Sequence, residues 1–242
     1  MYINDIHILL YVVIAILGSL IGQFINYVNV ALVNKRIILK KQTYQDYKQV
    51  AKTNYFLKII TMITYIGLLY KFGLSLELLK YVILTPMLIS VFITDLKTQT
   101  IPNRLVLTIF EIGLIFVFVL GIQNLNIAKD MLLGMAVGGG VFLLITIIGG
   151  ALAGKEAMGF GDVKLMAALG LYLGAVNIAL ISVIAFILGA IVSIILLIIG
   201  KSKKDGYVPF GPFIAVATLM TIFIPTGVLY TFLMKVLSLG MY

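Results

Sequence analysis

The feature that most limits the fold of this chain is a series of apolar runs, most of them long enough to cross a bilayer. A transmembrane helix needs about 20 consecutive, mostly apolar residues. Such runs stand roughly at 6–33, 55–72, 77–94, 103–122, 128–153, 163–175, 176–200 and 212–237. The chain is 62% hydrophobic and 11% charged, whereas soluble domains are about 45–50% apolar and about 25% charged. The sequence therefore predicts an all-α, polytopic membrane protein with about eight transmembrane helices.

These runs leave no room for a second, soluble domain, so we expect one membrane-embedded domain over residues 1–242. The run 163–175 is short for a full crossing; it would tilt, thin the bilayer or start inside a protein-lined cavity. The 23 glycines predict close packing between helices, with hinges as the alternative. The first run is followed, not preceded, by basic residues, which favours a retained helix over a cleaved signal.

The basic residues predict the orientation, because cytoplasmic loops are rich in Lys and Arg. With the N-terminus outside, the inner connections hold most of the 18 Lys and Arg. The exceptions are Lys71, Lys80, Lys129 and Lys235. Both termini are then external, and residues 34–58 form a short basic cytoplasmic loop. We expect the first basic residues of that loop to contact anionic lipid: Lys35, Arg36, Lys40 and Lys41.

Composition removes several classes of function. There is no cysteine and a single histidine, His7, so disulfides, cysteine-based zinc sites and Ser–His nucleophile pairs are not expected. We predict neither a metal nor another cofactor. The net charge of +9 would suggest nucleic acid in a soluble protein, but here the charge lies in short membrane loops. The bilayer is therefore the expected partner, nucleic acid is not, and no oligomeric state is predicted.

Only nine acidic residues are present, and most of them need no special explanation. Five are expected in loops or at helix ends, in contact with solvent: Asp5, Asp46, Glu77, Asp130 and Asp205. The other four are Asp95, Glu111, Glu156 and Asp162. Glu111 lies near the middle of the fourth run, where a charged carboxylate is unfavourable, so it should be neutral, paired or facing a cavity. For Glu111 the alternatives are a buried, protonated or hydrogen-bonded glutamate and a proton route or substrate contact. For Glu156 they are a solvated loop charge and a contact with the substrate's basic leader.

Asp95 and Asp162 stand at ends of apolar runs that face the same side in the predicted topology. Asp95 ends the third run, and Asp162 begins the sixth after a G-x-G sequence. Taken singly, each could be an ordinary helix-end carboxylate, Asp162 as a first-turn acid favoured by the helix dipole. Gly159 and Gly161 allow close approach of another segment, and Pro102 fits the first turn of the next helix.

Together the two aspartates have the chemistry of an aspartic protease. Two carboxyls held a few ångströms apart cannot both ionise easily, so one keeps a proton. The ionised carboxylate takes a proton from water, and the protonated one donates a hydrogen bond to the scissile carbonyl. Such a mechanism needs no metal, cysteine or histidine. The sequence thus predicts Asp95 and Asp162 as a catalytic pair at the cytoplasmic face.

The sequences around the pair resemble those of the type IV prepilin peptidases, membrane proteases that remove leader peptides from pilins and pseudopilins. Residues 95–103 (DLKTQTIPN) are similar to the first aspartate motif of that family, and residues 159–165 (GFGDVKL) to its G-x-G-D motif. Residues 208–213 (VPFGPF) resemble the segment before its last helix. Gly18-Ser19 and residues 24–26 (FIN), both in the first run, resemble the family more weakly.

The resemblance implies about eight helices, catalysis by Asp95 and Asp162, and cleavage after a glycine between a basic leader and an apolar helix. It also implies a plasma-membrane enzyme of a bacterium. Residues expected to shape the site are Gly159, Gly161, Pro102, Asn103, Lys164, Pro209, Gly211 and Pro212. Lys164 would pair with an aspartate or with a headgroup phosphate.

One departure from the family limits what the resemblance implies. Many bacterial members have a long cytoplasmic loop with paired, zinc-binding cysteines, and they also N-methylate the new N-terminus. Here residues 34–58 are short for that loop and contain no cysteine, which counts against a methyltransferase activity but not against the protease.

Two other functions compete with this interpretation. A proton- or cation-coupled transporter could use Asp95, Glu111 and Asp162, but it predicts repeated halves with matching broken helices, and no such repeat is visible. Other G-x-G-D intramembrane proteases, such as presenilin, have a tyrosine before the first aspartate and a Pro-Ala-Leu motif. This chain has Thr94 and residues 209–212 (PFGP) instead.

Overall fold

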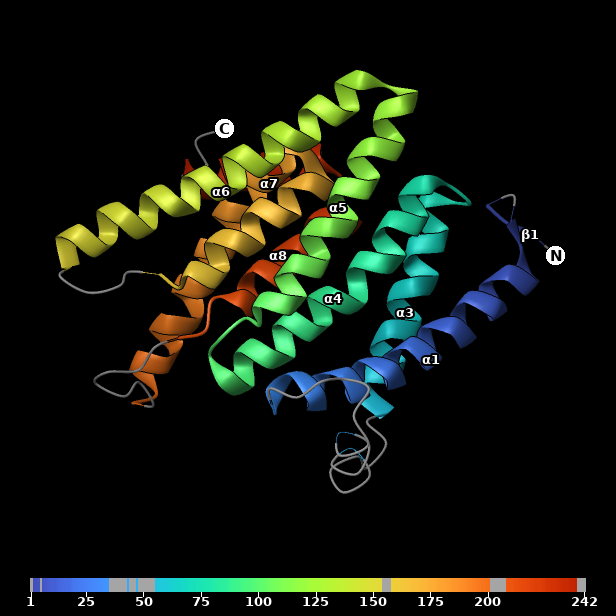
Figure 1. The fold of residues 1–242 in the computed structure, drawn as a ribbon, viewed down its shortest axis with the longest axis horizontal. Coiled ribbons are helices and arrows are strands. Elements are labelled where there is room, and N and C mark those ends of the chain that lie inside the picture. Colours follow the sequence, from blue (N-terminus) through green and yellow to red (C-terminus); the bar gives the residue numbers. More distant parts are fainter. Residues whose placement is uncertain are drawn as a thin grey trace. The chain divides into compact units, whose positions relative to one another are not determined.

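The protein is described here from a computed structural model, in which residues 2–4, 6–34, 43, 47, 55–153, 158–200 and 208–238 are described. A short antiparallel hairpin of β1 (Tyr2–Ile3) and β2 (Ile6–His7) precedes the helices. The helices are α1 (Ile8–Val33), α3 (Tyr55–Phe72), α4 (Leu76–Thr98), α5 (Asn103–Gln123), α6 (Leu125–Ala153), α7 (Phe160–Ile198), α8 (Gly211–Phe223) and α9 (Thr226–Leu237) (Figure 1).

The predicted all-α membrane architecture is confirmed. Within the described residues, α1 and α3 to α7 are long and apolar enough to cross a membrane. The first predicted run begins two residues early, because residues 6–7 form β2 and His7 caps α1 by accepting a hydrogen bond from the Leu9 N–H. The chain divides into two compact units, residues 1–98 and 99–242, and each is described by itself. Most of the basic loop 34–58 lies outside the described residues.

Unit 1 is built from α1, α3 and α4. Gly18 and Gly22 of α1 lie against the backbone of α3, which is the close packing predicted for small residues in membrane helices. Ile25 of α1, Leu57 of α3 and Ile89 of α4 form a shared buried cluster. Because α3 runs antiparallel to both neighbours, α1 and α4 run in the same direction, which sends Asp95 to the end of the unit where α1 ends.

Unit 2 is organised around α7, which packs on α5, α6 and α8. The Tyr172 hydroxyl of α7 donates a hydrogen bond to the Ile109 carbonyl oxygen of α5 at 2.9 Å. On the other side of α7, Gly170 lies against the backbone of Gly134 in α6. A Cβ on either glycine would overlap the backbone of the facing helix. The glycine-rich contact between α6 and α7 therefore confirms close packing.

The chain of α7 doubles back at Gly174. A Cβ on Gly138 of α6 would touch both the Met166 carbonyl oxygen and the Ile178 Cγ1, yet twelve residues of straight helix would separate these groups by about 18 Å. Gly174 has φ 77° and ψ 176°, a region that is essentially restricted to glycine. The predicted boundary between the runs 163–175 and 176–200 therefore corresponds to a sharp reversal inside one continuous helical segment.

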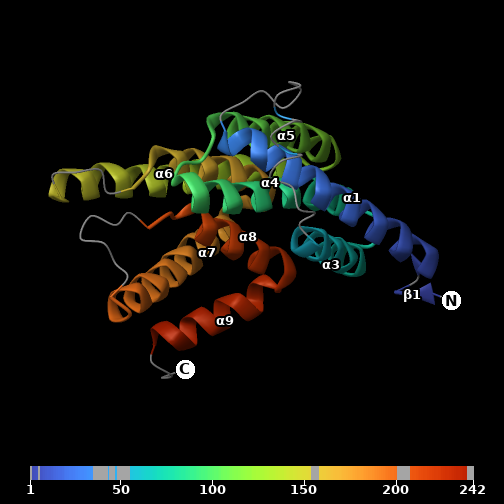
Figure 2. The same cartoon turned by 90° about the horizontal axis from the view of Figure 1, so that it is seen from below.

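The last predicted run, 212–237, is wrong as a single helix. It is divided into α8 and α9 by Ile224 and Pro225 (Figure 2), because proline lacks the N–H that a continuous helix needs. The Thr226 hydroxyl at the start of α9 donates a hydrogen bond to Asn177 Oδ1 at 2.9 Å. Asn177 is only three residues beyond Gly174, so the break between α8 and α9 lies close to the reversal in α7.

Candidate active site

Asp95 lies in the last turn of α4, in unit 1, and its side chain is only 3% exposed. Thr94 beside it is fully buried and its hydroxyl donates to the Ser90 carbonyl oxygen at 2.7 Å. Gln99, with φ 52°, adopts the left-handed conformation just after the helix, which is a common way to end a helix. The sequence after the first aspartate therefore forms the end of α4.

Asp162 lies in the first turn of α7, in unit 2, and is also only 3% exposed. Its backbone N–H donates to the Gly159 carbonyl oxygen at 3.0 Å, which begins the helix. Its carboxyl group lies in the first turn, where the helix dipole favours an anion. Both aspartates are thus buried residues at helix ends.

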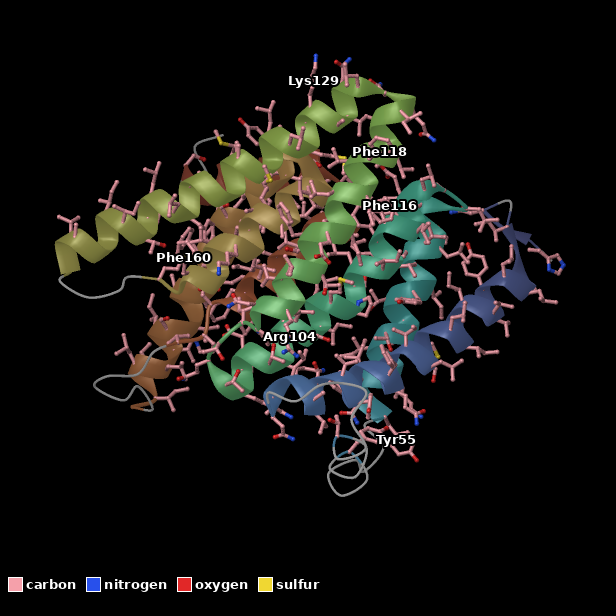
Figure 3. The ribbon with its side chains drawn as sticks, in the orientation of Figure 1. Tyr55, Arg104, Phe116, Phe118, Lys129 and Phe160 are labelled. Atoms are coloured by element: carbon pink, nitrogen blue, oxygen red, sulfur yellow. The ribbon has the colours of Figure 1, made fainter. Side chains whose placement is uncertain are left out.

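The turn that carries Asp162 is joined to the start of α5. The Lys164 amine donates a hydrogen bond to Asn103 Oδ1 at 3.2 Å and lies 5.2 Å from the centre of the Phe160 ring. Figure 3 labels Phe160 at the start of α7. A Cβ on Gly161 would lie 3.4 Å from the Ile101 Cβ. Residues from both sequence motifs, 99–103 and 159–164, therefore meet at one end of unit 2.

Two details of these motifs differ from expectation. Pro102 lies at the N-cap position of α5 rather than in its first turn, so its carbonyl oxygen accepts the hydrogen bonds from the Leu105 and Val106 N–H groups. Gly159 has an extended backbone, with φ −66° and ψ 134°, which any residue can adopt. In the G-x-G sequence, Gly161 lies close to Ile101, and Gly159 has no unusual backbone angle.

The Pro209–Pro212 segment is anchored by the aromatic ring between the prolines. Phe210 packs against Phe186 of α7 at 5.1 Å and Phe142 of α6 at 6.0 Å between ring centres. Gly211 and Pro212 are buried in the first turn of α8. The segment therefore fixes the start of α8 against α6 and α7.

The two glutamates are not placed with these residues. Glu111 is on the exposed side of α5, opposite the stripe that packs on α7, so the interpretation as a buried glutamate is wrong. Glu156 lies outside the described residues. The described part of the chain holds no group of three or more His, Cys, Asp and Glu side chains suited to a metal ion.

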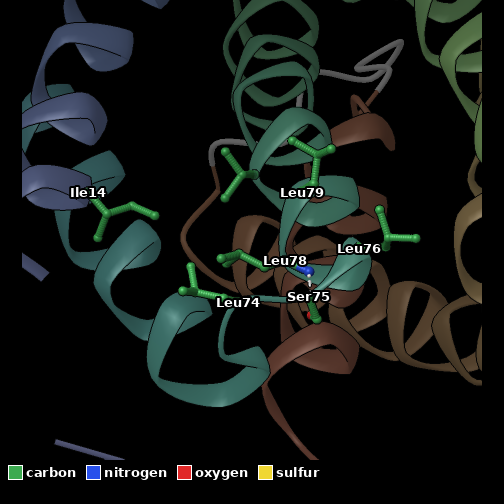
Figure 4. A pocket seen from close by; sticks show the side chains of 7 residues that line it. Ile14, Leu74, Ser75, Leu76, Leu78 and Leu79 are labelled. Atoms are coloured by element: carbon green, nitrogen blue, oxygen red, sulfur yellow. Dashed lines mark hydrogen bonds between the residues drawn. The ribbon is translucent and has the colours of Figure 1, made fainter. Parts of the chain in front are cut away.

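An apolar pocket in unit 1 lies at the opposite end of α4 from Asp95 (Figure 4). Its volume is about 490 Å³. Its lining residues are Ile14, Leu74, Ser75, Leu76, Leu78, Leu79 and Val82. None of them ionises in the physiological range, and Ser75 is used to cap α4 by accepting from the Leu78 N–H at 3.1 Å. This pocket has no group that could activate water, so it is not a candidate for the catalytic centre.

Sequence reasoning missed the role of Asp130, which it treated as a solvated acid. Asp130 of α6 is exposed, but its Oδ1 accepts a hydrogen bond from the Ala175 N–H at 3.2 Å. It thereby caps, from another helix, the segment that restarts after Gly174. No local pattern could have found this contact, because the two residues are 45 positions apart.

Comparison with known proteins finds one family that is similar to the segment with both aspartates. Residues 82–194 match the type IV leader peptidase family. A prepilin leader peptidase/N-methyltransferase of Legionella pneumophila is 30% identical over 188 residues, which cover 77% of this chain and 64% of that protein. The protein of that name from Xanthomonas campestris pv. campestris is 32% identical over 161 residues, 66% of this chain and 55% of its own length.

A third relative with this name, from Aeromonas hydrophila, is 32% identical over 139 residues, 57% of this chain and 47% of that protein. The chain thus spans between about half and two thirds of the length of the relatives that it matches. No solved structure matches it. The matched segment contains α5 and α6 whole, together with the buried carboxyls of Asp95 and Asp162. Residues 82–194, which include both aspartates, are therefore similar to the type IV leader peptidase family.

Proposed function

We propose that this protein is a membrane aspartic endopeptidase that removes the basic leader from prepilin-like or pseudopilin substrates. The observation that carries the proposal is the burial of Asp95 and Asp162, each in a helix end within the matched segment. A buried carboxyl is normally retained only where it is paired or functional. In the predicted topology both lie at the same depth on the cytoplasmic side, where a leader outside the membrane would reach them.

The proposed reaction is hydrolysis of one peptide bond by the aspartate pair. The ionised carboxylate removes a proton from a water molecule as its oxygen attacks the carbonyl carbon. The protonated carboxyl donates a hydrogen bond to the carbonyl oxygen, which stabilises the negative charge that develops there. Collapse of the intermediate breaks the C–N bond and the amine leaves with a proton. In this proposal the scissile bond follows a glycine at the start of the substrate's apolar helix.

Co-expression with a candidate prepilin tests the proposal. The expected result is a substrate shortened by its leader in cells that contain this protein, seen on a gel and located by N-terminal sequencing. A prepilin in which the glycine before the cleavage site is replaced should remain uncut. Failure to shorten any of a panel of prepilins from pili, secretion and DNA-uptake systems would argue against the proposal.

The hydrogen bond between Lys164 and Asn103 is expected to position the Asp162 turn for this reaction. Lys164→Met and Asn103→Ala should each lower the rate of leader removal several-fold, because this hydrogen bond from the lysine ammonium group is exposed to solvent and contributes on the order of 1 kcal/mol. The double variant should be no slower than the worse single variant, since both changes remove the same contact. Lys129→Met, at an exposed lysine of α6, is the matched control. Simple additivity of the two changes would contradict the positioning role.

We also propose that the product keeps a free amine, although the relatives carry the name of a methyltransferase as well. The support is the absence of cysteine in the whole chain, because the resemblance implies a cysteine-containing loop in members that methylate. Mass spectrometry of the mature substrate's N-terminal peptide should give the unmodified mass. A gain of one methyl group, dependent on this protein and on S-adenosylmethionine, would contradict the proposal.

A further inference from the structure

Glu111 occupies an unusual place on a helix that is long and apolar enough to cross the membrane. Residues Ile109 and Gly113 of α5 are buried, and Gly113 lies against Tyr172 of α7. Glu111 stands two residues from each, and a helix turns by 100° per residue, so its side chain points to the opposite side. It is exposed, and within the described residues no hydrogen bond or ion pair reaches its carboxyl group.

Exposed apolar residues flank Glu111 on this side of α5, which also carries the exposed residues Arg104, Thr108 and Ile115. Leu107, Leu114 and Phe118 are 55%, 40% and 72% exposed, and Phe118 is labelled in Figure 3. With Glu111, their spacing is four, three and four residues, which averages about 3.7 and follows the 3.6-residue turn of the helix, so the four residues lie along one face of α5. The four residues 107, 111, 114 and 118 are called the α5 seam below.

Lipid alone would leave the Glu111 carboxyl group of the α5 seam without a hydrogen-bond partner. Acyl chains cover leucine and phenylalanine, but they offer no hydrogen bond to a carboxyl group at the middle of a span. Acidic residues within membranes therefore pair with each other, with another polar group or with a water-filled cavity. The occupant of the seam should thus be a helix that presents a hydrogen-bonding group at the depth of Glu111.

We propose that the α5 seam packs against the same seam of a second copy of this chain. Copies in one membrane share an orientation, so a two-fold axis between them runs along the membrane normal. Packing of α5 on α5 about that axis places Glu111 opposite Glu111 at equal depth. A carboxylic acid is both a donor and an acceptor of hydrogen bonds, so two such groups satisfy one another. Arg104, one turn nearer the helix end, lies at headgroup depth, where water and phosphate separate the two copies' charges.

The cysteine-free sequence allows a direct test in membranes. Leu107→Cys and Leu114→Cys place single thiols one turn before and one turn after Glu111. The matched control is Ile147→Cys on α6, which is 59% exposed. Copper phenanthroline oxidation should produce a disulfide-linked dimer from the two seam variants, at least several-fold more than from the control.

Variants of Glu111 separate its role from that of the apolar residues. Glu111→Leu, in either seam-cysteine variant, should reduce cross-linking to the level of the Ile147→Cys control. Glu111→Gln should retain it, because the amide also donates and accepts. Equal cross-linking at all three cysteines, no dimer, or a dimer unaffected by Glu111→Leu would overturn the proposal. A cross-link from the seam to a prepilin in place of a second copy would overturn it as well. Asp162→Asn should leave the cross-links unchanged, so the outcome is independent of the proposed peptidase activity.

Discussion

Asp95→Asn and Asp162→Asn should each abolish removal of the leader from a co-expressed prepilin. An amide cannot take a proton from water, and it cannot share a proton with the remaining carboxyl. General acid–base catalysis by a positioned side chain contributes about 10²–10⁴-fold to a rate, and in a coupled pair the loss of one member removes the function of both. Leader removal on a gel, followed over time at equal enzyme levels, measures the loss.

Two comparisons make this result specific. Glu77→Gln changes an exposed acid at the beginning of α4, the helix that ends with Asp95, and should leave the rate unchanged. Membrane insertion and thermal stability of the Asp→Asn variants should match the parent, because an amide fills nearly the same volume. Full processing by either Asp→Asn variant would contradict the catalytic pair, and loss of activity in Glu77→Gln would indicate a general defect.

Gly174→Ala should cause a large loss of stability. At φ 77° and ψ 176° an L side chain is strained, which costs on the order of 1–3 kcal/mol. The new Cβ would also overlap the Asp130 carboxylate, so this side chain would have to move and release its hydrogen bond to the Ala175 N–H. The thermal unfolding midpoint of the detergent-solubilised protein, or its half-life at a fixed temperature, measures the effect.

Gly140→Ala is the matched control, because a Cβ there meets nothing within 4 Å and the residue lies inside α6. Alanine is favoured over glycine in a helix by up to about 1 kcal/mol, so this variant should be as stable as the parent or more stable. Repeating Gly174→Ala in an Asp130→Ala background removes the overlap and leaves the backbone strain. If Gly174→Ala proved as stable as Gly140→Ala, the reversal of α7 would not depend on this glycine.

The chemistry of the site and the topology of the chain are connected through this reversal. Because α7 doubles back at Gly174, the first half of α7, residues 160–173 with Asp162 in its first turn, is only 14 residues long, which is about 21 Å of helix. That length is short for a full crossing. The first half of α7 is held instead by its neighbours, through Tyr172 to α5 and through Gly170 to α6. The rigid support beneath Asp162 therefore comes from protein contacts.

Much of this architecture could be predicted from hydropathy, because the bilayer imposes one length and one polarity on every spanning helix. The predicted runs 55–72 and 103–122 agree with α3 and α5 to within one residue. The positions of Asp95 and Asp162 at helix ends were also accessible, since both stand where an apolar run meets polar residues. The run 212–237 failed because averaged hydropathy does not detect a single proline such as Pro225.

The sequence by itself determined the class of the protein, its membrane helices and the two aspartates, because apolar length and sparse acids are local properties that need no partner. Only the tertiary structure decided that both aspartates are buried, that Lys164 reaches Asn103, and that Asp130 caps the chain beyond Gly174. It also moved Glu111 from an expected interior position to an exposed seam. These outcomes depend on which helix faces which, and such contacts between distant residues leave no periodic signal in the sequence.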